Sequence, residues 1–463
     1  MTLAQDVTAV LQPGFVGTAA PAWLRAARSD GLVSVCLYGD NVGPGGGVAE
    51  VCSALRSELP GLLVAADEEG GDVTRLHYPG GSTAVGNAVL GRLDDEAATR
   101  RSAAGIGGEL AALGIGLDLA PVVDVNSAAE NPVIGVRSFG ADPDAVARHT
   151  AAWVEGLQST GVAACAKHFP GHGDTVADSH HDLPRVEAPV AVLRARELVP
   201  FAAAVRAGVE CVMTSHIVVT ALDPGRPATF SPLVLRVLRE DLGFEGVLVS
   251  DALDMAGASA ETGIPEAAVR ALAAGVDLLC LGSATGGEQL DAVRAHVLGA
   301  VATGRLEAFR VSEAAARVRR LADRRLDAGA PATATVPDAG TARAFTLTDH
   351  ARRFAAGTAP LAVVQVASGS NLAVGAVAWG PAALDATVRE DEVRPGDRVA
   401  VVGRGVGPDH PARAVVARLR AAGHEVVLVD CGWPRGGADV ETWGSSPAVA
   451  RALLGVLRGE IRP

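Results

Sequence analysis

Eight short apolar runs rich in β-branched residues recur along the chain, and stretches rich in Ala, Leu and Arg with helical spacing separate them. Alternating strands and helices build parallel sheets, and eight such units within about 300 residues favour a closed barrel over an open doubly wound sheet. We therefore predict an α/β fold with a (β/α)8 TIM-type barrel over residues 1–325. The predicted strands are Gly14–Gly17, Leu32–Tyr38, Leu62–Ala66, Gly116–Val122, Val162–Lys167, Glu210–Thr214, Gly246–Ser250 and Val276–Leu281. The clearest predicted helices are Asp94–Ala112, Pro143–Gln158, Pro189–Ala207 and Glu288–Thr303.

The composition changes near residue 326. The stretch LDAGAPATATVPDAGT is rich in Ala, Pro, Thr and Gly, which predicts a linker over residues 326–342. Residues 343–463 then predict a small α/β open-sheet domain. Its predicted strands are Leu361–Val366, Arg398–Val402 and Glu425–Val429, and its predicted helices are Pro411–Ala422 and Ser446–Arg458. The stretch GRGVG (Gly403–Gly407) follows a strand, as in dinucleotide sites, but its spacing departs from GxGxxG and Pro408 stands where the helix should begin. Nucleotide binding is therefore disfavoured.

Composition excludes several classes of function. The formal net charge is −13 and no basic block is present, which argues against a nucleic-acid surface. We expect neither a signal peptide nor a membrane-spanning segment, because the N-terminal stretch lacks a cationic and an apolar region and no uncharged apolar run reaches about 18 residues. The six cysteines are scattered and are expected to be buried thiols. These features predict a cytoplasmic enzyme.

The stretch KHFPGHGDTVADSHHDLP, Lys167 to Pro184, holds four of the eleven histidines and three aspartates. Such a density indicates either a metal site or proton-transfer chemistry. The same stretch contains the only lysine, whereas the other 39 of the 40 basic residues are arginine. This lone lysine could simply have escaped a codon bias that makes arginine the common cation, or its position could need a compact ammonium group, which a planar guanidinium does not replace. Its place inside this stretch favours the second interpretation.

Polar residues stand at the ends of several predicted strands. They are Asp67, Asp124, Lys167 with His168, Ser215 with His216, and Asp251. In barrels of this kind the reacting residues lie where strands end and loops begin. One such carboxylate is commonly only a helix cap, but several around one barrel mouth predict a site.

The 18-residue stretch closely resembles the signature of glycoside hydrolase family 3, specifically its β-N-acetylglucosaminidase branch. Five further stretches occur in the order that the family has them: ADEEGGDVTRL (Ala66–Leu76), APVVDVN (Ala120–Asn126), NPVIGVRSFG (Asn131–Gly140), MTSHI (Met213–Ile217) and VLVSDALDMAG (Val247–Gly257). The resemblance covers the predicted barrel. It implies a retaining exo-β-N-acetylglucosaminidase that acts on muropeptide fragments of peptidoglycan.

The resemblance also implies roles for individual residues. Asp251 matches the nucleophile that forms a glycosyl-enzyme, and His180 matches the general acid/base of this branch, with Asp178 orienting its ring. The residues that match the binding site for the terminal N-acetylglucosamine are Asp67, Arg75, Arg137, Lys167 and His168. We also expect His216 to line the pocket.

Elementary chemistry agrees with these roles. Retention needs a carboxylate on one side of the sugar ring and a proton donor on the other. A histidine titrates near neutrality, and a neighbouring aspartate stabilises its protonated form. A metal site is disfavoured, because Pro170, Gly171 and Gly173 break any helix that would align His168 with His172, and no HExxH motif exists. We expect no metal and no cofactor.

Three alternatives remain open at this stage. A histidine donor is neutral after proton transfer, so anionic phosphate could approach and the reaction could be phosphorolysis. The chain could also have a different β-sugar specificity in specialised metabolism, or bind a sugar without turnover. Two departures from the family bear on specificity: Asp72 stands where the family usually carries arginine, and the second domain is shorter than in other two-domain members.

Overall fold

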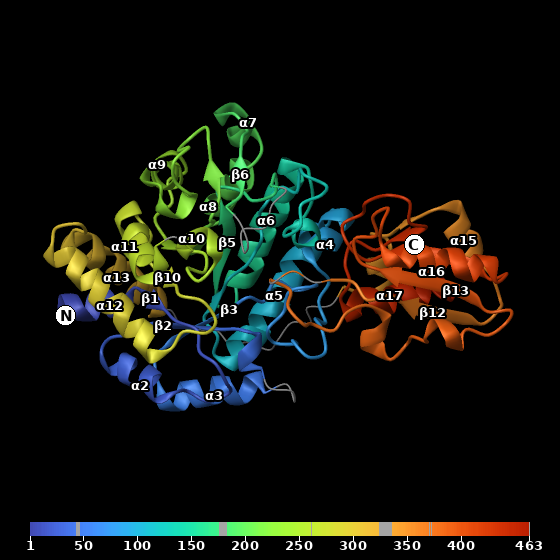
Figure 1. Ribbon diagram of the computed structural model, residues 1–463, viewed down its shortest axis with the longest axis horizontal. Coiled ribbons are helices and arrows are strands. Elements are labelled where there is room, and N and C mark those ends of the chain that lie inside the picture. Colours follow the sequence, from blue (N-terminus) through green and yellow to red (C-terminus); the bar gives the residue numbers. More distant parts are fainter. Residues whose placement is uncertain are drawn as a thin grey trace.

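The computed structural model describes residues 1–42, 47–175, 183–260, 262–323, 336–369, 371 and 373–462. The elements fall into two units that lie at opposite ends of the molecule (Figure 1). The N-terminal unit holds α1 to α13, and the C-terminal unit holds the sheet around β12, β13 and β14.

The N-terminal unit is built on parallel strands. Six of them form one sheet in the order β2-β3-β4-β5-β7-β9, and β1 pairs with β10. Hydrogen bonds join these sheets on both sides: for example, the amide of Leu278 donates to the carbonyl of Leu248 at 3.0 Å, and the amide of Cys36 donates to the carbonyl of Pro13 at 3.0 Å. The strands are β1 Leu11–Gln12, β2 Ser34–Leu37, β3 Leu63–Ala66, β4 Leu117–Asp118, β5 Ala163–Phe169, β7 Cys211–Thr214, β9 Val247–Val249 and β10 Leu279–Cys280. The predicted TIM-type barrel is confirmed.

The first strand lies earlier than predicted. The strand is Leu11–Gln12, whereas the prediction placed it at Gly14–Gly17. Burial explains the difference, because Leu11 and Gln12 are fully buried while Val16 is 64% exposed. Gly17 has a φ of +96°, a conformation that does not occur in strands.

Helices surround the barrel, and three of the four predicted helices begin and end within two residues of the predicted bounds. They are α1 Leu3–Ala9, α2 Ala22–Ser29, α3 Val48–Glu58, α4 Asn87–Leu93, α5 Glu96–Leu113, α6 Pro143–Gln158, α7 Val190–Ala195, α8 Leu198–Arg206, α9 Pro232–Arg236, α10 Ala256–Ser259, α11 Gly263–Ala274, α12 Gly287–Ala302 and α13 Ala308–Ala322. Helix α6 begins at Pro143 because the Asp142 side chain accepts a hydrogen bond from the amide of Asp144 at 3.0 Å.

The predicted helix Pro189–Ala207 is wrong as a single element, because α7 and α8 are separate helices. Pro200 explains the break. A proline excludes the carbonyl four residues before it from a helical hydrogen bond, and that residue is Arg196. Arg196 has a φ of −127° and a ψ of −74°, which lie outside the helical region.

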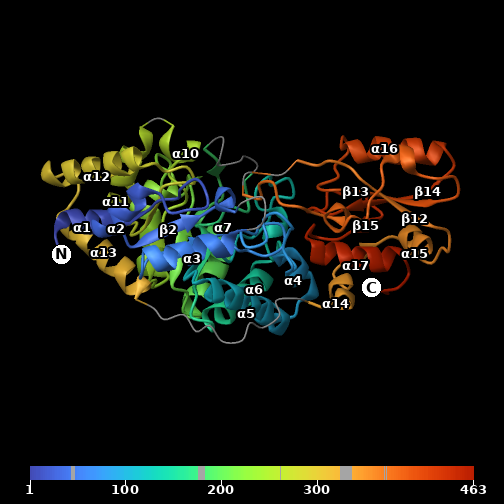
Figure 2. The same ribbon diagram turned by 90° about the horizontal axis from the view of Figure 1, so that it is seen from below.

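The C-terminal unit is a five-stranded sheet in the order β11-β15-β14-β13-β12. Alternate residues of β13 face opposite sides, so Val399 and Val401 pack with α16, while Ala400 and Val402 belong to the core cluster that includes α15 and α17. Figure 2 shows α16 on one side of the sheet and α15 and α17 on the other. The elements are α14 Asp338–Ala342, β11 Thr346–Leu347, α15 Asp349–Ala355, β12 Leu361–Gln365, β13 Arg398–Gly403, α16 Pro411–Ala421, β14 Glu425–Asp430, β15 Val440–Glu441 and α17 Pro447–Leu457.

The predicted small α/β open-sheet domain is therefore present. The linker boundary at residue 326 stays a prediction, because residues 324–335 lie outside the described part of the chain. The last five residues of the predicted linker, Asp338–Ala342, form helix α14. The amides of the GRGVG stretch bind the side chain of Asp430, at the end of β14. This carboxylate accepts hydrogen bonds from the amides of Gly405 at 2.7 Å and Val406 at 2.9 Å. These amides would otherwise face a phosphate, so the loop is already occupied by a side chain.

Two further observations concern the predicted cellular setting. All six cysteines are buried free thiols, as predicted, and form no disulfide bonds. Among the described helices, none has both the length and the apolar character that a bilayer crossing requires.

Candidate active site

A cavity of about 330 Å³ lies at the carboxyl ends of the barrel strands. Six of the predicted site residues line it: Asp67, Arg75, Arg137, Lys167, His168 and Asp251. Asp67 and Arg75 come after β3, and Arg137 lies in the loop after β4. Lys167 and His168 lie near the end of β5, and Asp251 comes after β9. The barrel topology thus brings together residues from four distant parts of the chain.

A buried ionic cluster forms the floor of the cavity. The Nζ of Lys167 lies 2.6 Å from Oδ1 of Asp67 and 2.7 Å from Oε1 of Glu69. Arg137 donates two parallel hydrogen bonds to Glu69, from Nε at 2.9 Å and from Nη2 at 2.8 Å. Lys167 is 2% exposed and Glu69 is 3% exposed. The paired geometry offsets the desolvation of these charges.

The pKa shifts of Lys167 and Glu69 favour the charged form of each group. Burial opposes the charge on Lys167, but Asp67 and Glu69 outweigh it and hold the pKa of the ammonium well above its usual value. Burial likewise opposes the charge on Glu69, yet Arg137 and Lys167 hold the pKa of this carboxyl far below its usual value. The cavity floor therefore presents fixed charges of both signs to a polar ligand.

The loop from Asp67 to Leu76 folds around the carboxylate of Glu68. One oxygen of Glu68, Oε2, accepts hydrogen bonds from Oγ1 of Thr74 at 2.8 Å, the amide of Arg75 at 2.8 Å and the amide of Leu76 at 2.9 Å. Gly71 turns the loop at a φ of +65°, where an added Cβ would lie 2.4 Å from the backbone of Gly86. This fold brings Nη2 of Arg75 to within 3.8 Å of Asp67 Oδ2.

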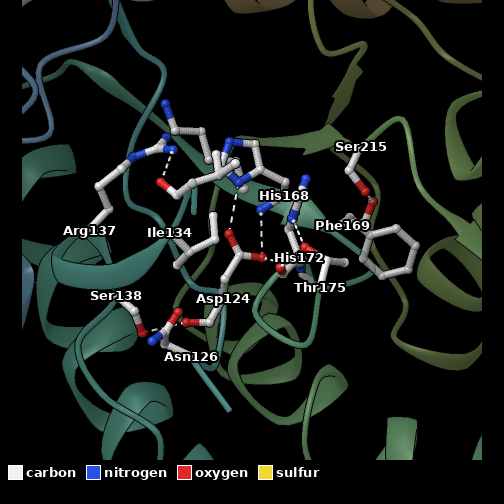
Figure 3. A network of polar contacts seen from close by, with 12 residues as sticks. Asp124, Asn126, Ile134, Arg137, Ser138, His168, Phe169, His172, Thr175 and Ser215 are labelled. Carbon is white, nitrogen blue, oxygen red and sulfur yellow. Dashed lines mark hydrogen bonds and ion pairs between the residues drawn. The ribbon is translucent and has the colours of Figure 1, made fainter. Parts of the chain in front are cut away.

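A second network centres on Asp124 (Figure 3). Its Oδ2 lies 2.8 Å from Nδ1 of His168, and its Oδ1 accepts a hydrogen bond from the amide of His172 at 2.7 Å. Burial raises the pKa of Asp124, but the charge and hydrogen bond of His168 reverse the effect and hold this pKa below its usual value. An ionised Asp124 makes Nδ1 of His168 the donor and fixes the orientation of the ring in the cavity wall.

His172 belongs to this network through its backbone amide and its ring. Burial lowers the pKa of its imidazole to about 4, so the ring is neutral at pH 7. Its Nδ1 lies 2.8 Å from Oγ1 of Thr175. Among the described residues, no group of three or more His, Cys, Asp or Glu is placed to hold a metal ion. The expectation of a metal-free site stays a prediction, because His180, His181 and Asp182 lie outside the described residues.

Asp251 follows β9 and stands in the wall of the cavity. Its amide donates to Oγ1 of Thr214 at 3.4 Å, and its Oδ1 accepts from the amide of Ala252 at 2.8 Å. His216 is fully buried, and its ring nitrogens contact Oγ1 of Thr229 at 2.9 Å and the carbonyl of Ala252 at 3.0 Å. His216 is not among the residues that line the cavity, and its ring contacts the backbone of Ala252, the residue that follows Asp251.

The predicted acid/base pair cannot be placed, since His180 and Asp178 belong to residues 176–182, outside the described part of the chain. Two contributors were not among the predicted site residues. Glu69 follows Asp67 closely in DEEGG, and that run of acidic residues at a strand end was its only signal. Ala373 of the second domain accepts a hydrogen bond from Nη2 of Arg75 at 3.0 Å, and no sequence pattern indicated it.

Comparison with known proteins places this site in a family. The profile described as the glycosyl hydrolase family 3 N terminal domain matches residues 30–321. The chain belongs to glycosyl hydrolase family 3. The predicted family is confirmed, and the matched region contains every site residue discussed above except Ala373.

Relatives and solved structures of family 3 resemble this chain to different extents. Beta-hexosaminidase A of Pseudoalteromonas piscicida is 36% identical over 313 residues, which are 62% of this chain and 52% of that protein. The beta-hexosaminidase of Methylococcus capsulatus is 38% identical over 230 residues, 49% of this chain and 68% of that protein. This chain thus spans about half of the first relative and about two thirds of the second.

Solved structures resemble this chain over both units or over part of it. A family 3 beta-N-acetylglucosaminidase from Paenibacillus sp. str. FPU-7 has a TM-score of 0.84 and 31% identity, and the match covers 100% of this chain and 97% of that one. The beta-N-acetylhexosaminidase from Beutenbergia cavernae has a TM-score of 0.60 and 31% identity, with 70% of this chain and 98% of that one covered. The similarity therefore extends to the second domain in the first case and to part of the chain in the second.

Proposed function

We propose that this family 3 protein is a retaining exo-β-N-acetylglucosaminidase that hydrolyses terminal β-linked N-acetylglucosamine through a glycosyl-enzyme on Asp251. One observation carries the proposal: Asp251 lines the same cavity as the buried cluster of Asp67, Lys167 and Arg137. A volume of about 330 Å³ suits one sugar ring rather than an extended chain. Fixed charges at its floor suit the many hydroxyl groups of such a ring.

The chemistry assigns one role to each group. The carboxylate of Asp251 attacks the anomeric carbon as the glycosidic bond breaks, and His180, charged and oriented by Asp178, gives its proton to the departing oxygen. Water then attacks the glycosyl-enzyme, His180 takes back a proton, and Asp251 leaves as a carboxylate. Two displacements at the same carbon retain its configuration.

The ionic cluster binds the sugar in this proposal. Asp67 accepts hydrogen bonds from sugar hydroxyls, while Arg75 and Lys167 donate to them. Because these groups are already fixed by each other, little ordering is required when the sugar replaces water. His168 presents the ring edge opposite Asp124 to the same ligand.

The activities of similar proteins support this substrate. The Paenibacillus protein is described as a beta-N-acetylglucosaminidase, and it matches this chain along its full length. We further propose that the protein acts on muropeptide fragments in the cytoplasm, because the stretch Lys167–Pro184 resembles the signature of the β-N-acetylglucosaminidase branch.

The test compares an aryl β-N-acetylglucosaminide with an aryl β-glucoside, each with and without phosphate. The proposal expects turnover of the first substrate, weak turnover of the second and no dependence on phosphate. Faster turnover with phosphate and a sugar 1-phosphate product would establish phosphorolysis instead. Turnover of neither substrate would refute the proposal.

A further inference from the structure

The loop that carries three of the site residues is bound by the second domain at its middle. Asp72 lies between Glu69 and Arg75, and its side chain is 6% exposed. Its Oδ1 accepts a hydrogen bond from the amide of Ser445 at 2.9 Å, and its Oδ2 accepts one from Oγ of Ser445 at 2.8 Å. Nη1 of Arg404 lies 4.0 Å from Oδ2. Ser445 lies just before α17 and Arg404 just after β13, so two elements of the second domain meet at this carboxylate.

The same domain also holds Arg75. Nη2 of Arg75 donates to the carbonyl of Ala373 at 3.0 Å, and Ala373 lines the sugar cavity. The guanidinium lies 6.0 Å from the centre of the Tyr78 ring, whose hydroxyl accepts a hydrogen bond from the amide of Ala376 at 3.0 Å. The segment of the second domain that contains Ala373 and Ala376 thus contacts both Arg75 and the Tyr78 side chain beside it.

Ser445 connects these two contacts. Its carbonyl accepts a hydrogen bond from the amide of Gly380 at 2.6 Å, at the end of the segment that carries Ala373 and Ala376. Arg404 lies 4.3 Å above the ring of Trp379, in the same segment. The packing is tight, because a Cβ on Gly81 of the barrel would lie 2.4 Å from the carbonyl of Ala378. A shift at Asp72 is therefore passed to the segment that touches Arg75.

We propose that Asp72 is a positioning residue that fixes the second domain on the site loop, so that the carbonyl of Ala373 holds Arg75 in its sugar-binding pose. The inference rests on the proposed function, in which Arg75 donates to the sugar. The charge at this position supports it. An arginine at position 72, which the family usually carries, would face Arg404 and offer no acceptor to Ser445.

The first experiment measures KM and kcat of Asp72→Ala on the aryl β-N-acetylglucosaminide. The expected result is a KM raised by roughly tenfold with a smaller change in kcat, since Arg75 binds the sugar before and during reaction. Asp72→Asn keeps one acceptor for Ser445 and should recover part of the loss. Arg92→Ala is the matched control, because Arg92 also joins the two units, through the carbonyl of Ala344 at 3.5 Å and the ring of Trp443. This control should keep the wild-type KM, whereas equal KM values for Asp72→Ala and the wild type would overturn the inference.

A double-mutant cycle separates this role from a general loss of structure. If Asp72 acts through Arg75, then Asp72→Ala should change KM little in an Arg75→Ala background. The same fold-change in both backgrounds would overturn the inference. A wild type without turnover would instead overturn the proposed function. In that event hydrogen exchange decides the inference separately: the amides of Arg75 and Leu76, bound to Glu68, should exchange faster in Asp72→Ala than in Arg92→Ala, and equal rates would overturn it.

Discussion

Replacing the single lysine by arginine tests whether the site needs a compact ammonium. Lys167 is 2% exposed and its Nζ contacts two carboxylates at 2.6 and 2.7 Å. A guanidinium keeps the charge, but it is planar and larger, and the carboxylate of Glu69 already binds the guanidinium of Arg137 through two hydrogen bonds. A second guanidinium at this place must displace Asp67, Glu69 or the sugar.

The magnitude follows from the contacts. One hydrogen bond to a charged group contributes about 1.5–3 kcal/mol, and about 1.4 kcal/mol corresponds to a factor of ten. If Lys167→Arg disturbs at least one of the two contacts, kcat/KM should fall by at least roughly tenfold. Lys167→Met should lower kcat/KM further, because it leaves Asp67 and Glu69 without their shared cation. It should also lower the free energy of unfolding by about 3–5 kcal/mol.

The assay is steady-state hydrolysis of the aryl β-N-acetylglucosaminide, with thermal unfolding followed by circular dichroism as the control for folding. We expect Lys167→Arg, which keeps the charge, to lose less unfolding free energy than Lys167→Met and still to lose activity. A kcat/KM near that of the wild type would refute the reasoning. The lone lysine would then reflect only the codon bias that made arginine the common cation.

Four further expectations concern the reacting groups. Asp251→Ala should abolish turnover, and a mechanism-based fluorosugar should label Asp251 in the wild type; labelling of another residue would remove it from the role. His180→Ala should slow substrates with poor leaving groups far more than dinitrophenyl glycosides, and azide should rescue the latter as the β-glycosyl azide; equal slowing without rescue would assign the acid/base role elsewhere. Dialysis against EDTA should leave activity unchanged, and a stoichiometric metal in the purified protein would contradict this. Burial lowers the pKa of His172 to about 4, so as the pH falls the unfolded chain binds this proton before the folded chain does. The free energy of unfolding should therefore fall as the pH drops from about 6.5 to about 4. In denaturant unfolding His172→Gln should show a shallower decline with pH, and the same decline as in the wild type would contradict this expectation.

The sequence alone was sufficient for the barrel, the second sheet and the family. Strand and helix periodicity is local, so eight alternating units were visible without any knowledge of contacts. Strand ends are also local, which is why Asp67, Lys167 and Asp251 were assigned to one rim before their separation was known. The errors were local as well: the first strand lies three residues earlier, and Pro200 divides one predicted helix into α7 and α8.

Only the tertiary structure decided which of these side chains are partners. Lys167 and Asp67 are 100 residues apart, Arg75 and Ala373 are 298 apart, and Asp72 and Ser445 are 373 apart. Hydrogen bonds over such separations form because barrel closure and domain packing bring the groups within 3 Å, and no periodic pattern records them. His216 is a strand-end residue like Asp251, but it does not line the cavity. Its buried ring instead makes hydrogen bonds with Thr229 and the carbonyl of Ala252, which only the tertiary structure reveals.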